Sequence, residues 1–433
     1  MPFRSARRLL AMDVRELFGS TAFLLLLLVA GPLVGISFAA AVRAYAEASG
    51  GGGGVAALSS SLSPLDGMLV PTLGAYDLLI TFLVPFVAIR LVSSEKSSGA
   101  LALLLQSPVT FAAKLTSKLL ALLLGWLACL VPAVCALLLW RAYGGHLALP
   151  ETANLLLGHT LRYVLTCSLA IAAAAILESA ASAGIAVLSF TIGTWALDFF
   201  ATGRGDWIAA LARYTPAAML RQFERGLLGA PVGIAALGAS ALLLFIAAAF
   251  LDLRTSATTR IVRVAIAILV ATALLAMRSD RSLDVSEDRR NSFSAADERL
   301  LRSIAEPVTI RVQLAAEDPR ASEYERGVLT KLRRTLRDLR VEYPYAGRSA
   351  LFENDDQYGT IVYRIGPRKV SSRSTTEEIV LDELETLARM TPPARGESAY
   401  PGHPLHAAPR GAAAIFYFVW PLLIIALWAL RRR

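Results

Sequence analysis

The feature that most limits the possible folds of this chain is a series of apolar runs, most of them long enough to cross a bilayer. They cover residues 20–42, 71–92, 119–140, 161–177, 184–200, 232–251, 261–277 and 412–430. A helix needs roughly 20 apolar residues to span the hydrocarbon core. The chain has 433 residues, of which 55% are hydrophobic and 18% charged, and a single soluble core does not explain that composition. We therefore expect a polytopic α-helical membrane protein.

Basic residues lie at alternate ends of these runs and so predict the orientation of the spans. They gather in residues 4–15, 96–118, 254–263 and 431–433. Lys and Arg near a span end resist translocation and stay in the cytoplasm. Eight crossings then place both termini in the cytoplasm and residues 278–410 outside it. We expect a multi-pass protein of the inner (cytoplasmic) membrane.

The net charge of +9 belongs to the membrane part of the chain. Residues 278–409 carry more than half of all charged residues, in nearly balanced numbers. A nucleic-acid-binding protein needs its positive charge on one soluble face, so we expect no nucleic-acid partner. Cys129, Cys135 and Cys167 all lie inside apolar runs, where cysteine behaves as a small hydrophobic residue, and they give no redox or metal signal.

Residues 278–391 have the pattern of a small extracytoplasmic α/β domain. Ser294, followed by acidic residues, predicts the N-terminus of a helix. Pro307 precedes an alternating strand over residues 308–314. The later elements expected are two helices and a strand, at residues 324–339, 376–390 and 358–365. Alternation of strands and helices favours an α/β fold.

Residues 95–119 connect two apolar runs on the cytoplasmic side. They predict a short helix on the membrane surface, a break at Ser107 and Pro108, and a basic segment leading into the next span. A soluble partner could bind a loop of this kind. An ordinary amphipathic connector between two spans accounts for the same residues.

This connector resembles the first cytoplasmic loop of the membrane subunit of type-2 ABC exporters, the ABC-2 permeases. The resemblance implies that it is the coupling loop, which receives the stroke of a separate ATPase. Ala102 stands where the family has a second Glu. The residues assigned to the coupling loop are Glu95, Lys96, Ser98, Gly99, Leu103, Ser107, Pro108, Lys114 and Lys118. A second cytoplasmic turn contains Glu178 and Ser179.

Residues 1–19 predict a basic amphipathic helix in the headgroup region. Arg7, Arg8 and Arg15 alternate with apolar residues, and Glu16 precedes Leu17. The permease family has an interfacial helix of this kind ahead of its first span. A simple positive-inside anchor needs the same residues.

Two further stretches resemble the gliding-motility-associated branch of the ABC-2 permeases. The first resembles the step before the sixth span, with Thr215, Pro216, Phe223, Arg225, Gly226, Leu227 and Leu228. The second resembles the signature of the extracytoplasmic auxiliary protein of that branch, with Asp284, Val285, Ser286, Arg289, Phe293, Ser294, Pro307, Val308 and Ile310. Gly229 and Gly233 then form a GxxxG packing notch at the start of span six.

Together the two resemblances imply a natural fusion of permease and auxiliary domain. The expected order is an interfacial helix (1–19), a six-span permease domain (20–253), a seventh span (254–277), the α/β domain (278–391), a Pro/Gly-rich linker (392–410) and an eighth span with a basic tail (411–433).

The chain contains no recognisable catalytic motif. It has no GxxxxGK[ST] loop for nucleotide phosphates and no HExxH or GxSxG element. We expect no enzymatic activity and no cofactor in this chain, with ATP and Mg in a partner subunit. His403 and His406 form an isolated HxxH in irregular chain, where no metal site is expected.

The function expected from the resemblance is the membrane subunit of an ABC exporter. Its partners would be ABC ATPase subunits in two copies, a second permease copy or homologue, membrane lipid and an envelope partner of the α/β domain. An ATP-independent membrane scaffold that presents the α/β domain is the alternative. An intramembrane enzyme would have to use the scattered acids Asp77, Glu178 and Asp198.

Overall fold

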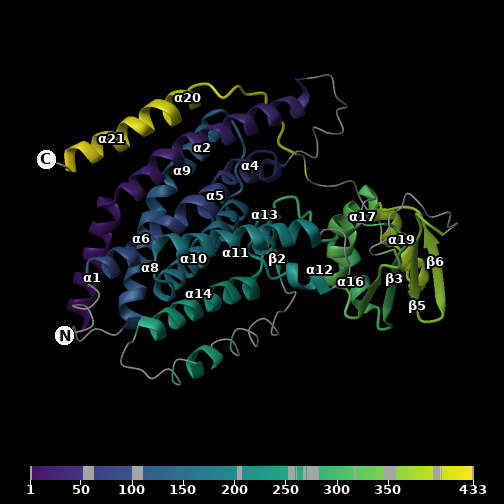
Figure 1. Cartoon of the computed structure of the whole chain (residues 1–433). Helices are drawn as coiled ribbons and strands as arrows, with labels where there is room; N and C mark the ends of the chain where they lie inside the picture. Colours follow the sequence, from purple (N-terminus) through teal and green to yellow (C-terminus); the bar gives the residue numbers. More distant parts are fainter. Residues whose placement is uncertain are drawn as a thin grey trace. The chain divides into compact units, whose positions relative to one another are not determined.

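A computed structural model describes residues 2–51, 63–99, 111–201, 207–251, 259, 261–266, 270, 282–315, 318–345, 357–393, 400 and 402–431 (Figure 1). Of the described residues 73% are helical, and the strands among them form two small sheets. It divides into two compact units, each built from segments that are distant in the sequence. Unit 1 comprises Met1–Gly193, Val232–Arg278 and Pro401–Arg433, and unit 2 comprises Thr194–Pro231 and Ser279–Tyr400.

Within the described residues, seven helices are long and apolar enough to cross a membrane, as in a multi-pass helical membrane protein. They cover Thr21–Gly50, Leu65–Ser97, Ala113–Ala142, Leu149–Ile176, Ala180–Ala201, Ala230–Leu251 and Ala412–Leu430. Most of the remaining predicted span, residues 261–277, lies outside the described part of the chain. Span four was predicted too short, because its helix begins at Leu149 rather than near Leu161.

The helices of unit 1 follow the chain in this order: α1 (Pro2–Gly19), α2 (Thr21–Ala46), α4 (Val70–Leu73), α5 (Ala75–Leu78), α6 (Val84–Ser97), α8 (Phe111–Cys129), α9 (Val131–Ala142) and α10 (Leu149–Ile176). The π-helical turn Leu65–Leu69 leads into α4, and the π-helical turn Leu79–Leu83 joins α5 to α6. Together these elements form one long helix, Leu65–Ser97. Helices α11 (Ala180–Ala201) and α14 (Ala230–Leu251) cross the boundary between the two units. The last span consists of α20 (Ala412–Ala414), a π-helical turn and α21 (Trp420–Arg431).

The core of unit 1 lies among the first four spans, where α1 packs on α8 and α10 packs on α6. Its centre is aromatic. The ring of Trp126 stacks on Tyr163 at 4.6 Å and meets the edge of Tyr76 at 5.2 Å. Both tyrosine hydroxyls donate to carbonyls of the third span, Tyr76 to Cys129 at 2.7 Å and Tyr163 to Leu122 at 2.8 Å. Their polar ends are therefore satisfied without water.

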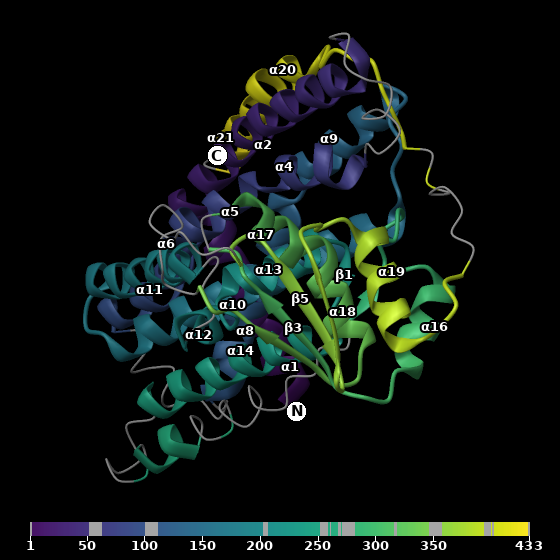
Figure 2. The same ribbon diagram turned by 90° about the vertical axis from the view of Figure 1, so that its right-hand side faces the viewer.

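The last span packs on the first, although nearly the whole chain separates them in sequence (Figures 1 and 2). Gly31 and Gly35 of α2 leave room for two aromatic rings. A Cβ atom at Gly31 would lie 2.1 Å from the indole of Trp420, and one at Gly35 would lie 2.4 Å from Phe416. The Trp420 indole also donates to the Leu27 carbonyl at 2.7 Å. Small residues at helix contacts let the backbones approach closely.

The packing notch predicted at Gly229 and Gly233 was wrong. Gly229 precedes α14, and its nearest contact is the Gln222 side chain. A Cβ at Gly233 would make only an ordinary contact with Leu161, at 3.7 Å. Gly31 and Gly35 have the same spacing and do form a packing notch, which holds Trp420 and Phe416.

Unit 2 contains a four-stranded sheet in the order β4-β3-β5-β6, formed by β3 (Val308–Val312), β4 (Leu339–Glu342), β5 (Ile361–Ile365) and β6 (Arg368–Ser372). Strand β4 runs parallel to β3, and the other pairs are antiparallel. Figure 2 shows the strands with the helices α16 (Ala295–Ser303), α17 (Pro319–Tyr324), α18 (Thr330–Thr335) and α19 (Glu377–Ala388). Alternate residues Val308, Ile310 and Val312 enter the core of this unit, as the period of two predicts.

Several expectations for unit 2 are confirmed, and two are corrected. Ser294 caps α16 by accepting from the Asp297 amide, and the strand after Pro307 is present. The charged helix does not reach Leu339, because it ends at Thr335 and β4 follows. Strand β6 was not predicted. It forms a hairpin with β5 at Gly366, whose φ of +57° favours glycine.

Candidate functional site

A buried cluster of charges joins the helices on either side of the predicted coupling loop. At its centre is Lys118 of α8, whose ammonium group lies 2.6 Å from Glu95 of α6 and 3.2 Å from Asp13 of α1. It also donates to the Leu91 carbonyl at 3.1 Å. Ser117 donates to the second oxygen of Asp13. The three charged residues, Asp13, Glu95 and Lys118, are buried, at 1%, 7% and 3% exposure.

Lys96 connects a fourth helix, α10, to this cluster. Its ammonium group donates to the carbonyls of Ala174, Ala175 and Leu177, at 2.9, 3.2 and 2.9 Å. Ala174 and Ala175 lie in the last turn of α10 and Leu177 directly follows it. The last carbonyls of a helix have no partner within the helix, and the helix dipole favours a cation there. Lys96 and Lys118 thus tie α6 to α10, α8 and α1.

Local sequence explains why α1 can supply Asp13 to this cluster. The helix is amphipathic, and it buries Leu17 and packs Phe18 edge-on against Phe23 at 4.9 Å. Ser20 then caps α2 by accepting from the Phe23 amide at 3.2 Å. Glu16 accepts from Ser94 of α6 at 2.7 Å. These contacts hold α1 against the first two spans, so that Asp13 faces Lys118.

The described residues of the predicted coupling loop are not all exposed, as they would be in a simple docking loop. Glu95, Lys114 and Lys118 are buried and Lys96 is half-buried, whereas Ser98 and Gly99 are exposed. A soluble partner cannot contact a buried ion pair directly. Binding of an ATPase to the predicted coupling loop stays a prediction, in which Glu95 and Lys118 lie inside the protein. Leu103, Ser107 and Pro108 lie outside the described residues.

The other predicted site residues lie on the surface of the described structure. Arg7, Arg8 and Arg15 are exposed and Glu16 is half-buried. Glu178 and Ser179 are exposed, and the Ser179 hydroxyl accepts from the Ser182 amide at 3.0 Å at the start of α11. Sequence reasoning did not select Asp13 and Ser117. Asp13 could have been selected because it is an acidic residue within a basic helix.

The acidic members of the cluster could be considered as metal ligands. Oxygen atoms of Asp13, Glu16 and Glu95 lie within 4.8 Å of one another. The ammonium group of Lys118, however, already binds two of these carboxylates. It supplies the positive charge that a metal ion would bring, so this arrangement is better suited to structure than to metal chemistry.

A second polar group lies near the middle of two spans. Asp77, in the helix Leu65–Ser97, forms an ion pair with Arg162 of α10 at 3.0 Å and lies 3.5 Å from Nδ1 of His159. Arg162 also donates to Thr81 at 3.2 Å. The Asp77 side chain is 33% exposed, while His159 is buried and has no hydrogen-bond partner among the described residues. Charged groups at this depth are costly and mark transport pathways or relays.

The sequence drew attention to Asp77 but not to His159 or Arg162. The other two acids considered with it lie elsewhere. Asp198 pairs with Arg221 within unit 2, and Glu178 is exposed on the turn before α11. Within unit 1, Asp77 and Glu178 therefore have different surroundings.

In unit 2, the segment before span six and the start of the α/β domain lie against each other. Helices α12 (Trp207–Ala212) and α13 (Pro216–Glu224) lead to β1 (Leu227–Leu228), which pairs antiparallel with β2 (Leu283–Asp284). The Val285 amide donates to the Gly226 carbonyl at 2.9 Å. Asn291 donates to the Arg225 carbonyl at 2.6 Å. The segment before span six is thereby attached to the start of the α/β domain.

Asp284 organises this junction. Its carboxylate accepts hydrogen bonds from the Ser286 amide and hydroxyl, from the Asn291 amide and from the Ser292 hydroxyl. Gly226 has a φ of +78°, and a Cβ there would lie 2.8 Å from the Cβ of Ser286. The close approach of the two stretches thus requires a glycine at this position.

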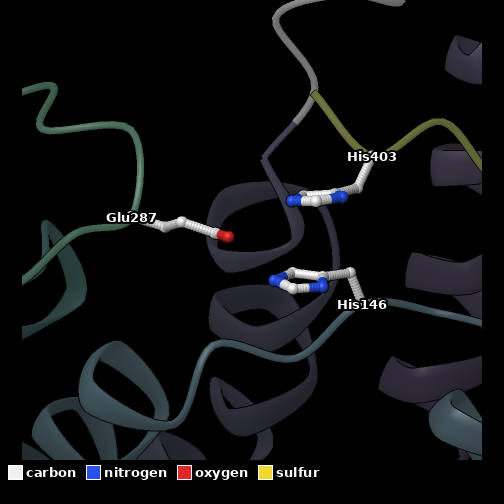
Figure 3. A group of neighbouring side chains, drawn as sticks. All are labelled: His146, Glu287 and His403. Carbon is white, nitrogen blue, oxygen red and sulfur yellow. The ribbon is translucent and has the colours of Figure 1, made fainter. Parts of the chain in front are cut away.

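The histidine of the linker has a role that the HxxH spacing did not predict. His403 stacks on His146, with ring centroids 3.7 Å apart and an angle of 13° between the planes (Figure 3). Glu287, drawn in the same view, belongs to unit 2. The Tyr45 hydroxyl donates to the His403 carbonyl at 2.6 Å, and Ser49 accepts from the Leu405 amide at 2.9 Å. These contacts fasten the linker to the end of the first span.

Comparison of the chain with family models, with curated proteins and with solved structures found no match.

Proposed function

We propose that this chain is the membrane subunit of an ABC-type exporter, powered by a separate ATPase and fused to an extracytoplasmic α/β domain. In this proposal the chain lies in the inner membrane with both termini in the cytoplasm. Two ATPase subunits bind ATP and Mg, and a second copy of the chain or a homologue completes the pathway. The substrate is hydrophobic or amphiphilic.

The observation that carries the proposal is the charge cluster around Lys118. Glu95 and Lys96 begin the predicted coupling loop, and Lys118 lies at its end. Because Lys118 binds α1 and α6 and Lys96 binds the end of α10, a displacement of the loop would be transmitted to four helices together. Buried ion pairs resist separation, since breaking one leaves an uncompensated charge. An unstrained connector between two spans does not need such bracing.

The pair of Asp77 and Arg162 favours a transporter over an inert anchor. A helix that only holds a domain in the membrane gains nothing from an ion pair near its middle, where each charge is costly. A partly exposed pair at that depth provides polar contacts along a route through the bilayer. The rival function, an ATP-independent scaffold, is supported only by the presence of a folded α/β unit.

Affinity purification of the tagged chain from its native membrane, followed by mass spectrometry, tests the proposal. One variant replaces residues 100–110 with a Gly/Ser linker of equal length and keeps Glu95, Lys96 and Lys118 intact. The matched control replaces residues 52–62 in the same way. We expect an ABC ATPase to co-purify with the wild type and the control but not with the first variant. Recovery of envelope proteins without any ATPase would reject the exporter in favour of the scaffold.

A further inference from the structure

A cavity of about 310 Å³ opens between α1, the start of α2 and α6. Its polar wall includes Arg15, Ser20, Arg90 and Ser94, and its apolar wall includes Leu17 and Leu91. All of these residues belong to unit 1. The cavity thus combines two guanidinium groups from different helices with an apolar surface.

Arg90 occupies an unusual position for a charged residue. Its side chain is exposed although it lies within a membrane-spanning helix, and no described residue accepts a hydrogen bond from it. It lies seven residues before Ser97, which corresponds to roughly 10 Å of helix. At that distance from the end of a span, the anions available to an outward-facing arginine are the phosphates of lipid headgroups.

The other walls of the cavity suit the same ligand. Arg15 approaches from the amphipathic helix α1, and the N-terminus of α2 adds the positive end of a helix dipole. The carboxylate of Glu16, which also lines the cavity, accepts a hydrogen bond from Ser94. The apolar wall can contact an acyl chain, which a free phosphate ion lacks.

We infer that this cavity binds the phosphate of an anionic lipid headgroup, with Arg15 and Arg90 as its ligands. Because Glu16 and Ser94 bond across the cavity wall, a bound lipid braces α1 against α6 next to the cluster of Asp13, Glu95 and Lys118. Lipid occupancy therefore stabilises the arrangement that the proposed coupling uses. The inference itself depends on the membrane location of the chain and holds whether or not an ATPase binds.

The experiment measures the thermal stability of the full chain in a neutral sugar detergent after lipid removal. Phosphatidylglycerol, phosphatidylcholine and inorganic phosphate are titrated separately. The test variant is R15Q/R90Q, and the control R7Q/R8Q removes two charges from the exposed face of α1 outside the cavity. The single variant R90Q serves if the double variant does not fold.

We expect phosphatidylglycerol to stabilise the wild type and R7Q/R8Q, and phosphatidylcholine to have little effect. Because R15Q/R90Q lacks two positive charges, the phosphatidylglycerol concentration that gives half-maximal stabilisation should rise by roughly tenfold or more in this variant. Equal weakening in both double variants would mean general charge attraction and would refute the site. Equal stabilisation by inorganic phosphate would reject a lipid as the ligand and leave a free anion site.

Discussion

Lys118 and Glu95 form a buried ion pair of 2.6 Å across the segment that was predicted to dock an ATPase. The two residues are 23 positions apart in the sequence and lie on different helices. Their contact shows that the two ends of the predicted coupling loop are joined inside the protein. In the proposed function, the ATPase binds the segment between these two residues, and the ion pair transmits the movement of that segment to the helices.

The K118M variant should be strongly destabilised. It leaves Asp13 and Glu95 buried without their shared cation, and removing one partner of a buried pair costs about 3–5 kcal/mol. The E95Q variant should lose less, because Asp13 still pairs with Lys118. Unfolding by SDS in mild detergent measures both, with the exposed S97A as the control. Equal stability of K118M and S97A would contradict the assigned role.

The pair of Asp77 and Arg162 should behave as a neutral unit. Either D77N or R162Q leaves a single charge near the middle of the membrane, so each should lower the apparent melting temperature and the yield of monodisperse protein. The double variant D77N/R162Q removes both charges and should recover much of that loss. Fluorescence-detected size exclusion after heating measures all three. If the double variant is no better than the single ones, charge compensation is not what the pair provides.

The contact between the first and last spans depends on the absence of a side chain at Gly31. In the G31V variant the new atoms overlap the Trp420 indole, which must move and lose its bond to Leu27. We expect faster protease cleavage of the C-terminal segment, with partial recovery in G31V/W420A. G193A is the matched control, since a Cβ at Gly193 meets no atom within 4 Å. Equal cleavage rates in G31V and G193A would count against the packing described.

The junction between β1 and β2 should fail when Gly226 gains a side chain. A φ of +78° and the 2.8 Å approach to Ser286 both oppose G226A, at a cost of roughly 1–3 kcal/mol. Hydrogen exchange of the full chain should show faster exchange at the Val285 amide, which donates across the junction. G327A lies in the same unit with open space around it and provides the control. Unchanged protection at Val285 would be inconsistent with this account.

The α/β unit should lose part of its stability in acid through Asp318. Hydrogen bonds from Arg320 lower the pKa of this carboxyl below its ordinary value, with smaller help from the Arg320 amide and Tyr358. Its ionised form therefore stabilises the fold above the unfolded pKa of about 4, and that contribution disappears as the pH falls through the lower folded pKa. Unfolding midpoints of wild type and D318N should differ at pH 6 and converge in acid. A difference that does not shrink toward pH 3 would disprove the assignment.

Much of the secondary structure could be predicted because it depends on local pattern. The spans follow from runs of apolar residues, and Ser294 and the strand after Pro307 follow from capping and alternation. Strands β4 and β6 were missed since each is an edge strand with a half-exposed, polar face. Their pairing with β3 and β5 stabilises them more than their own sequence does.

The candidate site was predictable only in part. The charges of the coupling segment are visible in the sequence, but their burial depends on α1 and α8 meeting α6. Asp13, His159 and Arg162 come from helices whose neighbours no local pattern specifies. Residues 225–228 and 284–286 were singled out in the sequence, whereas their pairing through β1 and β2 could not be predicted from it.

By itself, the sequence determined that this chain is a helical membrane protein with a small α/β unit, because hydrophobicity and periodicity are properties of single segments. Only the tertiary structure decided which charges meet. An ion pair such as that of Lys118 with Glu95 and Asp13 depends on how helices rotate and pack, and helices that are alike in hydrophobicity leave that choice to side-chain contacts between them. The glycine notch of Gly31 and Gly35 is one such contact, and it brings the last span to the first.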